Sequence, residues 1–195
     1  MYRVLCDGLP VHDLRDEELV LLDPQATLEV NTAGSFSFKM PPTHPQYDLP
    51  KKMRSCIEIW HDDEQIFAGR PTTDTVDFYN RKNIECEGQL AYLNDVHNSQ
   101  VDESRQFEVG IVTVTDTNDS LYRYTNYNST WKEIKEDLID DLGGYIRVRN
   151  HNGHRYIDYI AEFDNLCSQS IQFGENLLDC AREVDMTDIA TAVIP

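Results

Sequence analysis

The chain contains no apolar run approaching the ~20 residues that a membrane-spanning helix needs. Its first ten residues, MYRVLCDGLP, lack the basic region and following apolar stretch of a secretory signal. We therefore expect a protein that is made and used without secretory export. Neither a Gly-x-x-x-x-Gly-Lys-Ser/Thr nor a Gly-x-Gly-x-x-Gly motif occurs, so the sequence shows no nucleotide-binding signature.

Cysteines are few, odd in number and scattered, with no Cys-x-x-Cys pair among them. This spacing argues against a disulfide framework and against a structural zinc site. Two of them, Cys56 and Cys86, lie in strand-like runs, and we expect them to be small core residues. The five cysteines are Cys6, Cys56, Cys86, Cys167 and Cys180.

Basic residues are also scarce: 17 Lys and Arg face 35 Asp and Glu, which gives a net charge of -18. Such an anionic surface repels phosphate backbones, so the composition disfavours stable nucleic-acid binding. It is compatible with simple solubility, and also with a surface that nucleic acid passes without sticking. The 40% of hydrophobic residues are enough for a real core.

The sequence pattern of residues 1–94 predicts an all-β region. The run SFSFKM alternates apolar and polar residues with a period of two, which is typical of a half-buried strand. The four prolines of residues 41–50 predict a long loop. Short strands joined by tight turns favour a β-barrel or sandwich. The predicted strands cover residues 2–6, 19–23, 27–31, 35–40, 55–60, 65–70, 75–79 and 83–93.

Residues 95–195 have a different pattern, which predicts a small α+β module. A strand within 107–116 precedes a helix over 129–144, in which Thr130 and Glu133 have the spacing of a capping box. Gly143 is expected to end this helix in the left-handed conformation. Its apolar face comprises Trp131, Ile134, Leu138 and Leu142.

The stretch RNHNGHRYID follows the helix, and its Asn152-Gly153 pair predicts the two-residue turn of a β-hairpin. In that register His151 pairs with His154, Val148 with Ile157, and Arg147 with Asp158. One face then carries Ile146, Val148, Ile157 and Tyr159, and the other carries the histidines with Arg149 and Tyr156. The last residues, 168–195, read as strand, short helix and strand. We thus expect the whole chain to be α+β and β-rich, with a barrel domain at 1–94 and an α+β module at 95–195, and we expect this module to be incomplete at its carboxy-terminal end.

Several patterns suggest chemistry, and each has a plainer structural interpretation. His151 and His154 could share a cation, but zinc needs a third protein ligand and Arg149 lies on the same face, so a polar hairpin tip is favoured. The weaker candidates are His97, Asp102 and Ser104 as a hydrolase triad, Glu85 and Glu87 as paired carboxylates, and residues 116–120 as a calcium loop. None has the supporting pattern that its chemistry requires. We therefore predict no catalytic, cofactor-binding or metal-binding residues and no enzymatic activity.

Six segments in order resemble the amino-terminal hub portion of siphophage and prophage tail-tip proteins. The family is named baseplate hub protein, tail-associated lysin or prophage endopeptidase tail protein. The similarity runs through essentially the whole chain. The segments are AGSFSFKMPPTHPQY, IFAGR, DFYNRKNIECEGQLAYLND, HNSQVDESRQFEVG, LGGYIRVRN and SQSIQFGENLLD.

The resemblance implies a structural subunit of the tail tip that forms a homotrimer around the tail axis. Such hubs close the tail tube, contact the distal tail protein and the tape measure protein, and open for DNA, which passes without stable binding. The expected locations are the virion tail and, during assembly, the host cytoplasm. Two alternatives remain: a tail-associated peptidoglycan hydrolase or peptidase, and a receptor- or carbohydrate-binding tail module that uses exposed Tyr and Trp residues.

Two departures from the family pattern bear on trimerisation. Relatives carry a helix-bearing insertion where LNDVHNSQ here joins the two parts directly. They also continue past ATAVIP into strands that help to complete the barrels. Missing strands would leave open sheet edges, which are prone to non-native pairing.

Overall fold

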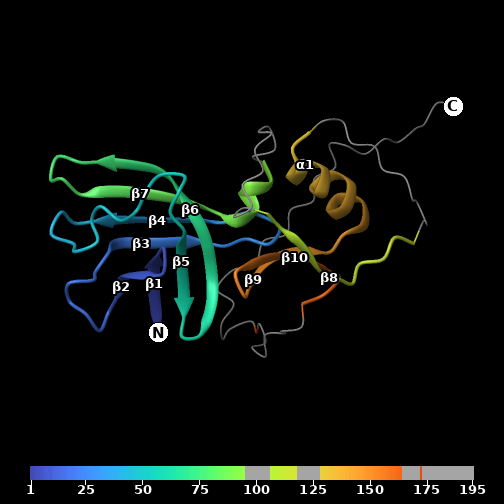
Figure 1. Ribbon diagram of the computed structural model, residues 1–195. Helices are drawn as coiled ribbons and strands as arrows, with labels where there is room; N and C mark the ends of the chain where they lie inside the picture. The colour runs from blue at the N-terminus through green and yellow to red at the C-terminus, as the bar shows by residue number, and fades with distance from the viewer. Residues whose placement is uncertain (95–105, 118–127, 164–171, 173–195) are drawn as a thin grey trace. The chain divides into compact units, whose positions relative to one another are not determined.

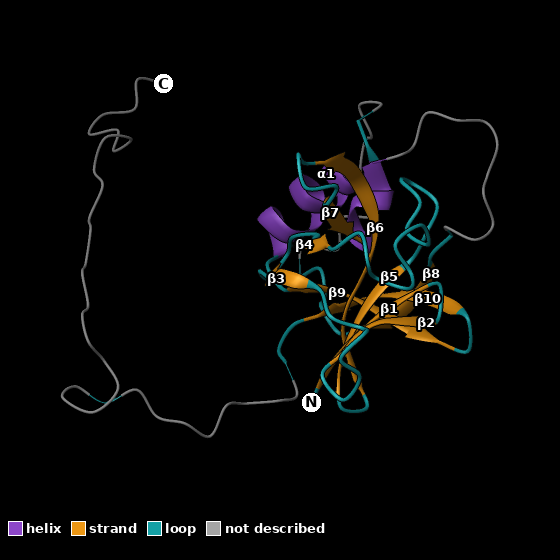
Figure 2. Ribbon diagram, turned by 90° about the vertical axis from the view of Figure 1, so that its left-hand side faces the viewer, coloured by secondary structure: helices purple, strands orange, loops and turns teal. Residues whose placement is uncertain are grey.

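A computed structural model describes residues 1–94, 106–117, 128–163 and 172 (Figure 1). Residues 1–162 form one compact unit. Strands dominate it, with few helical turns (Figure 2). The predicted β-rich α+β fold is confirmed: a curled antiparallel half-barrel sheet is accompanied by a small helix and a second sheet.

The half-barrel sheet has seven strands in the order β2-β1-β5-β6-β7-β4-β3. All of its neighbouring strands run antiparallel. Tight turns with positive φ connect some of them, as at Asp7 and Gly8 (φ 50 and 80) between β1 and β2. The strands are β1 (Tyr2–Cys6), β2 (Leu9–Asp13), β3 (Leu22–Thr27), β4 (Ser35–Met40), β5 (Ile57–His61), β6 (Glu64–Val76) and β7 (Lys82–Gly88).

The core of this sheet follows the period of two that the sequence shows. In β4, Phe36 and Phe38 are 3% and 2% exposed, while the alternating Ser35 is exposed and Ser37 and Lys39 are half-buried. Cys6 and Cys86 are buried beside them, so Cys86 is a core residue as predicted. Cys56, by contrast, lies just before β5 and is only half-buried.

Several strand predictions for this sheet need correction. Strand β2 was missed, and the predicted strands at 19–23 and 27–31 are replaced by the single strand β3, which runs from Leu22 to Thr27. The separate strands predicted at 65–70 and 75–79 are one thirteen-residue strand, β6, which ends at Val76 rather than at residue 79. The predicted strand at 83–93 stops at Gly88 and continues as the 3₁₀ helix η1 (Gln89–Asn94). Burial explains η1, because Leu90, Tyr92 and Leu93 are all buried and an alternating strand would expose one of every two.

The second sheet has the order β8-β10-β9, with β8 (Glu108–Val112), β9 (Tyr145–His151) and β10 (His154–Ile160). The hairpin register is confirmed: His151 pairs with His154 and Arg147 with Asp158. Asn152 and Gly153 have φ values of 52 and 80, as a two-residue hairpin turn requires. Strand β8 joins β10 in parallel, a pairing that the sequence did not indicate.

The helix packs its apolar face on this sheet, and Trp131, Ile134 and Leu138 contact the cluster around Ile146 and Tyr159. It begins as α1 (Thr130–Ile134) and continues as the π-helix η3 (Lys135–Asp140). The predicted cap at Thr130 is wrong by one residue, because the hydroxyl of Ser129 accepts from the Lys132 amide. Gly143 adopts the predicted left-handed conformation, with φ 73.

The predicted division of the chain into two domains after residue 94 stays a prediction. The strand, short helix and strand predicted within residues 168–195 lie outside the described part of the chain, which includes only Gln172 in this range. Among the described residues, no helix is long and apolar enough to cross a membrane.

Acid is expected to weaken the half-barrel through His12. Its imidazole is 8% exposed and accepts a hydrogen bond from the Leu21 amide, 3.1 Å away. Burial lowers the pKa of His12 from its ordinary 6.5, so the unfolded chain takes up this proton before the folded chain does. The stability from neutral His12 is therefore full above about pH 6.5 and is lost as pH falls through the lowered folded pKa. Urea denaturation at pH values from about 7.5 to 5 measures this loss. A His12→Gln variant should flatten the profile, and exposed His151→Gln should leave it unchanged.

Candidate functional site

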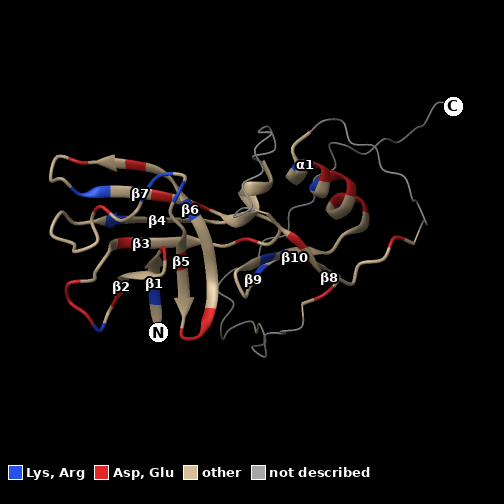
Figure 3. Ribbon diagram, viewed as in Figure 1, with Lys and Arg blue, Asp and Glu red and all other residues tan. Residues whose placement is uncertain are grey.

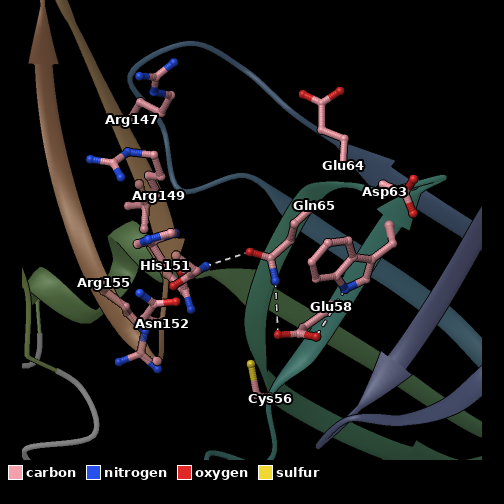
Figure 4. Close-up of a pocket in the computed structure, with 15 residues that line it drawn as sticks. Cys56, Glu58, Asp63, Glu64, Gln65, Arg147, Arg149, His151, Asn152 and Arg155 are labelled. Atoms are coloured by element: carbon pink, nitrogen blue, oxygen red, sulfur yellow. Dashed lines mark hydrogen bonds between the residues drawn. The ribbon is translucent and has the colours of Figure 1, made fainter.

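A polar cleft of about 730 Å³ lies between β5 and β6 on one side and the β9–β10 hairpin on the other (Figure 4). A chain of hydrogen bonds crosses its floor. Asn150 donates to Gln65 at 2.8 Å and to Gln89 at 3.0 Å, and Gln65 donates to Glu58 at 3.0 Å. The indole of Trp60 also donates to Glu58, at 3.2 Å. These contacts couple the hairpin to the half-barrel sheet with neutral amides, which fix its position without a buried charge.

A second polar group occupies the other face of the hairpin. Asp158 is 0% exposed, and its carboxylate accepts hydrogen bonds from the guanidinium groups of Arg147 (3.0 and 3.3 Å) and Arg149 (3.1 and 3.2 Å). It also accepts from the Ile111 amide of β8, 2.9 Å away. The guanidinium of Arg149 lies over the ring of Tyr156, 5.0 Å from its centroid. Arg147 and Arg149 also line the cleft, but in Figure 4 both arginines point away from Gln65 and Glu58.

The charge state of this group follows from its contacts. Burial pushes the pKa of Asp158 upward, but hydrogen bonds from Arg149, the Ile111 amide and Arg147 outweigh it and hold the pKa below its usual value. An ionised carboxylate with this many donors around it is locked in place. The lowered pKa of Asp158 does not suit a general acid, which needs a raised pKa. The arrangement therefore ties three strands together.

The two histidines lie side by side at the hairpin tip, as predicted, but they have different surroundings. The Nδ1 of His154 lies 2.6 Å from a carboxylate oxygen of Glu108 on β8. His151 is exposed and lines the cleft. No group of three or more His, Cys, Asp or Glu residues that could hold a metal ion occurs in the described parts of the chain.

The other candidate sites are placed only in part. Glu85 accepts from the Thr73 hydroxyl at 3.1 Å, and Glu87 accepts from the buried Arg70 at 2.7 Å, so both carboxylates are engaged by neighbouring strands. The triad candidates His97, Asp102 and Ser104 lie outside the described residues. So do residues 118–120 of the calcium-loop candidate.

The cysteines of the described residues are held as neutral thiols. Burial is the main cause, and it raises the pKa of Cys6 to about 12 and that of Cys56 to about 11. Burial also raises the pKa of Cys86. A neutral thiol is a poor nucleophile and a poor metal ligand, and Cys6 and Cys86 pack in the core of the half-barrel sheet. Cys167 and Cys180 lie outside the described residues.

Sequence reasoning missed two residues that matter here. The Asn31 side chain donates to the Gly144 carbonyl at 3.1 Å and accepts from the Ile146 amide at 2.8 Å, so it caps the outer edge of β9 where that strand begins. A β-carbon on Gly110 would lie 2.0 Å from the Asp158 carboxylate, so only glycine fits there. Asn31 offered one signal, since asparagine tolerates the positive φ of 57 that it adopts. Gly110 offered none.

Comparison with known proteins bears on the fold through one solved structure. No protein-family model and no curated protein matches the sequence. One similar solved structure is the prophage MuSo2 43 kDa tail protein from Shewanella oneidensis. It is 14% identical with a TM-score of 0.51, over 80% of this chain and 54% of that chain. The chain shares the fold of a prophage tail protein.

A second similar structure is the prophage tail protein gp18 from Listeria monocytogenes EGD-e, with 13% identity and a TM-score of 0.43, over 80% of this chain and 50% of that chain. The chain thus spans about half the length of each of these tail proteins. The resemblance to tail proteins that the sequence suggested agrees with the first of them at the level of the fold.

Proposed function

We propose that this protein is a structural, non-enzymatic subunit of a phage tail tip or baseplate hub. It oligomerises around the tail axis as a homotrimer, closes the tail tube and opens for DNA during ejection. The observation that carries this proposal is the fold shared with a prophage tail protein over 80% of the chain. The six ordered segments that resemble tail-tip hubs give the finer assignment.

The charge of the chain supports the same role. A net charge of -18 gives an anionic surface that repels DNA, as the wall of a conducting tube must. Part of this charge faces the lumen, so DNA passes without stable binding. The neighbours in the tail are the distal tail protein on one side and the tape measure protein inside. The protein is then located in the virion tail, and in the host cytoplasm while the tail assembles.

The test is made on purified particles of the phage that encodes the chain. We expect mass spectrometry to find the chain in isolated tails, and immunogold labelling to place it at the tail tip. Light scattering of the purified protein should give three times the chain mass of 22.5 kDa. Absence of the chain from tails, or labelling along the tail tube, would overturn the assignment. Peptidoglycan or peptide cleavage that a point substitution abolishes would favour the enzymatic alternative instead.

A further inference from the structure

Three of the four sheet edges in the described part of the chain are protected against another strand. Edge strand β2 contains Pro10, and edge strand β3 contains Pro24 and an irregular register. Proline removes an amide donor from an edge, and a bulge bends the edge away from a partner. The edge of β9 is capped at its start by the side chain of Asn31. Features of this kind commonly protect edge strands against pairing with another molecule.

In the described part of the chain, strand β8 has neither a proline nor a covering side chain, although its pairing with β10 also shifts register between Ile157 and Tyr159. Its sequence, EVGIV, contains no proline, lysine or arginine, and it forms an end of its sheet. Val109 is 81% exposed, Val112 55% and Ile111 49%. The strand is nevertheless held in place, because the Ile111 amide donates to Asp158 and the Thr113 amide donates to the Tyr159 carbonyl at 3.0 Å. A fixed, apolar, bare edge is the template that an added strand requires.

An apolar groove of about 490 Å³ adjoins this edge. Val109 and Val112 of β8 line one side, and Ile134 and Leu138 of the helix line the other. A strand added to β8 would direct alternate side chains toward such a groove. The edge therefore offers backbone hydrogen bonds, and the groove offers selectivity for apolar side chains.

The charge around the groove selects the occupant. Its charged lining residues among those described are Glu108 and Asp116, both acidic. The adjoining helical segment adds Glu133, Glu136, Asp137, Asp140 and Asp141 against Lys132 and Lys135 (Figure 3). A second copy of this chain, with a net charge of -18, is poorly matched to that rim. Residues 163–195 carry six acidic residues and one arginine, so charge disfavours them equally.

We propose that β8 and its adjoining groove form a strand-addition site for an extended segment of a partner protein. That segment carries alternating apolar side chains and is flanked by basic residues. In the tail role this partner is a neighbouring tail protein, and only that identification rests on the proposed function.

The test uses the full chain and a fluorescent peptide, KTVTVTVK, followed by fluorescence anisotropy. We expect the acid-flanked peptide ETVTVTVE to bind about tenfold or more weakly, because like charges meet at the rim. A Val109→Lys variant, which places a charge on the bare edge, should also lose about tenfold or more in affinity. The matched control is Val76→Lys on β6, where the valine is 56% exposed, and it should bind KTVTVTVK as the unchanged chain does.

Hydrogen exchange identifies the edge that is used: β8 amides should gain protection when KTVTVTVK is added, and the amides of β2 and β3 should not. Equal affinity for both peptides, or binding that Val109→Lys leaves intact, would refute the proposal. Failure of KTVTVTVK to bind at all would refute it too. Concentration-dependent self-association that Val109→Lys removes would assign the edge to a second copy instead. These outcomes are independent of whether the chain is found in tails, so the two proposals fail separately.

Discussion

An Asp158→Ala variant is expected to lose about 2–4 kcal/mol of its free energy of unfolding. The substitution removes the acceptor of the Ile111 amide and of both arginines, and it leaves a small cavity where the carboxylate was 0% exposed. The range lies below that for a fully buried ion pair, because Arg147 and Arg149 are 38% and 39% exposed and can be rehydrated. Urea denaturation of the full chain, monitored by circular dichroism, measures the loss.

The matched control is Asp140→Ala, which removes an exposed carboxylate from the helix and should change the free energy of unfolding by less than about 0.5 kcal/mol. A second variant addresses the same contact from β8. In Gly110→Ala the new β-carbon would lie 2.0 Å from the Asp158 carboxylate, so we expect β8 to separate from β10. If Asp158→Ala were no more destabilising than Asp140→Ala, the carboxylate would not hold these strands together.

The effect of Asp158→Ala should also depend on pH. The hydrogen-bonded carboxylate has a pKa below its ordinary 3.8 in the folded chain, despite the opposing effect of burial. Its contribution is therefore complete above about pH 4 and is lost as pH falls through the lowered folded value. The stabilities of the variant and the unchanged chain should converge in strong acid. A constant difference between them would show that packing, not the ionised carboxylate, supplies the stability.

The sequence predicted the parts of this network that are local. A two-residue turn fixes the register of a hairpin, so Arg147 could be placed opposite Asp158 from the spacing alone. The hydrogen bonds that the Arg149 guanidinium and the Ile111 amide donate to Asp158 could not be predicted. The Ile111 contact spans 47 residues and depends on a parallel pairing, for which no short-range pattern exists.

The difference between local contacts and contacts between distant residues also explains the corrections to the fold. The alternation of Phe36 and Phe38 predicts β4 with its observed bounds, because one of its faces is buried. The predicted strands at 65–70 and 75–79 belong to one strand, since β7 pairs continuously along it across a bulge near Pro71. Local signals at this proline and the residues around it favour a break, and tertiary pairing overrides them. The contacts of Asn31 with Gly144 and Ile146, more than a hundred residues away, were likewise beyond any local pattern.

A Gly88→Ala variant is expected to lose about 3 kcal/mol or more of its free energy of unfolding. Gly88 pairs with Gly69 across β6 and β7, and a β-carbon on Gly88 would lie 1.8 Å from the Ala33 carbonyl oxygen. The obstacle is backbone, which cannot rotate away as a side chain can. The Gly88 amide also donates to the Gly34 carbonyl at 3.2 Å, so the added methyl group would push this loop off the sheet.

The control for Gly88→Ala is Gly153→Ala in the hairpin turn. Gly153 has φ 80, and a β-carbon added there would meet no atom within 4 Å, so the substitution costs only the backbone strain, about 1–2 kcal/mol. Thermal or urea unfolding of both variants separates steric exclusion from backbone strain. If Gly153→Ala were the more destabilising of the two, the close approach of the Ala33 carbonyl would not be what requires glycine at position 88.

The consequence of Gly88→Ala should extend beyond the half-barrel sheet. The loop that rests on Gly88 also carries Asn31, whose side chain bonds the Gly144 carbonyl and the Ile146 amide at the edge of β9. Displacing the loop should therefore uncover that edge, and the Ile146 amide should exchange faster with solvent in the variant. An Asn31→Ala variant should give the same faster exchange with Gly88 intact. Unchanged exchange at Ile146 in Gly88→Ala would mean that the loop couples to β9 through other contacts.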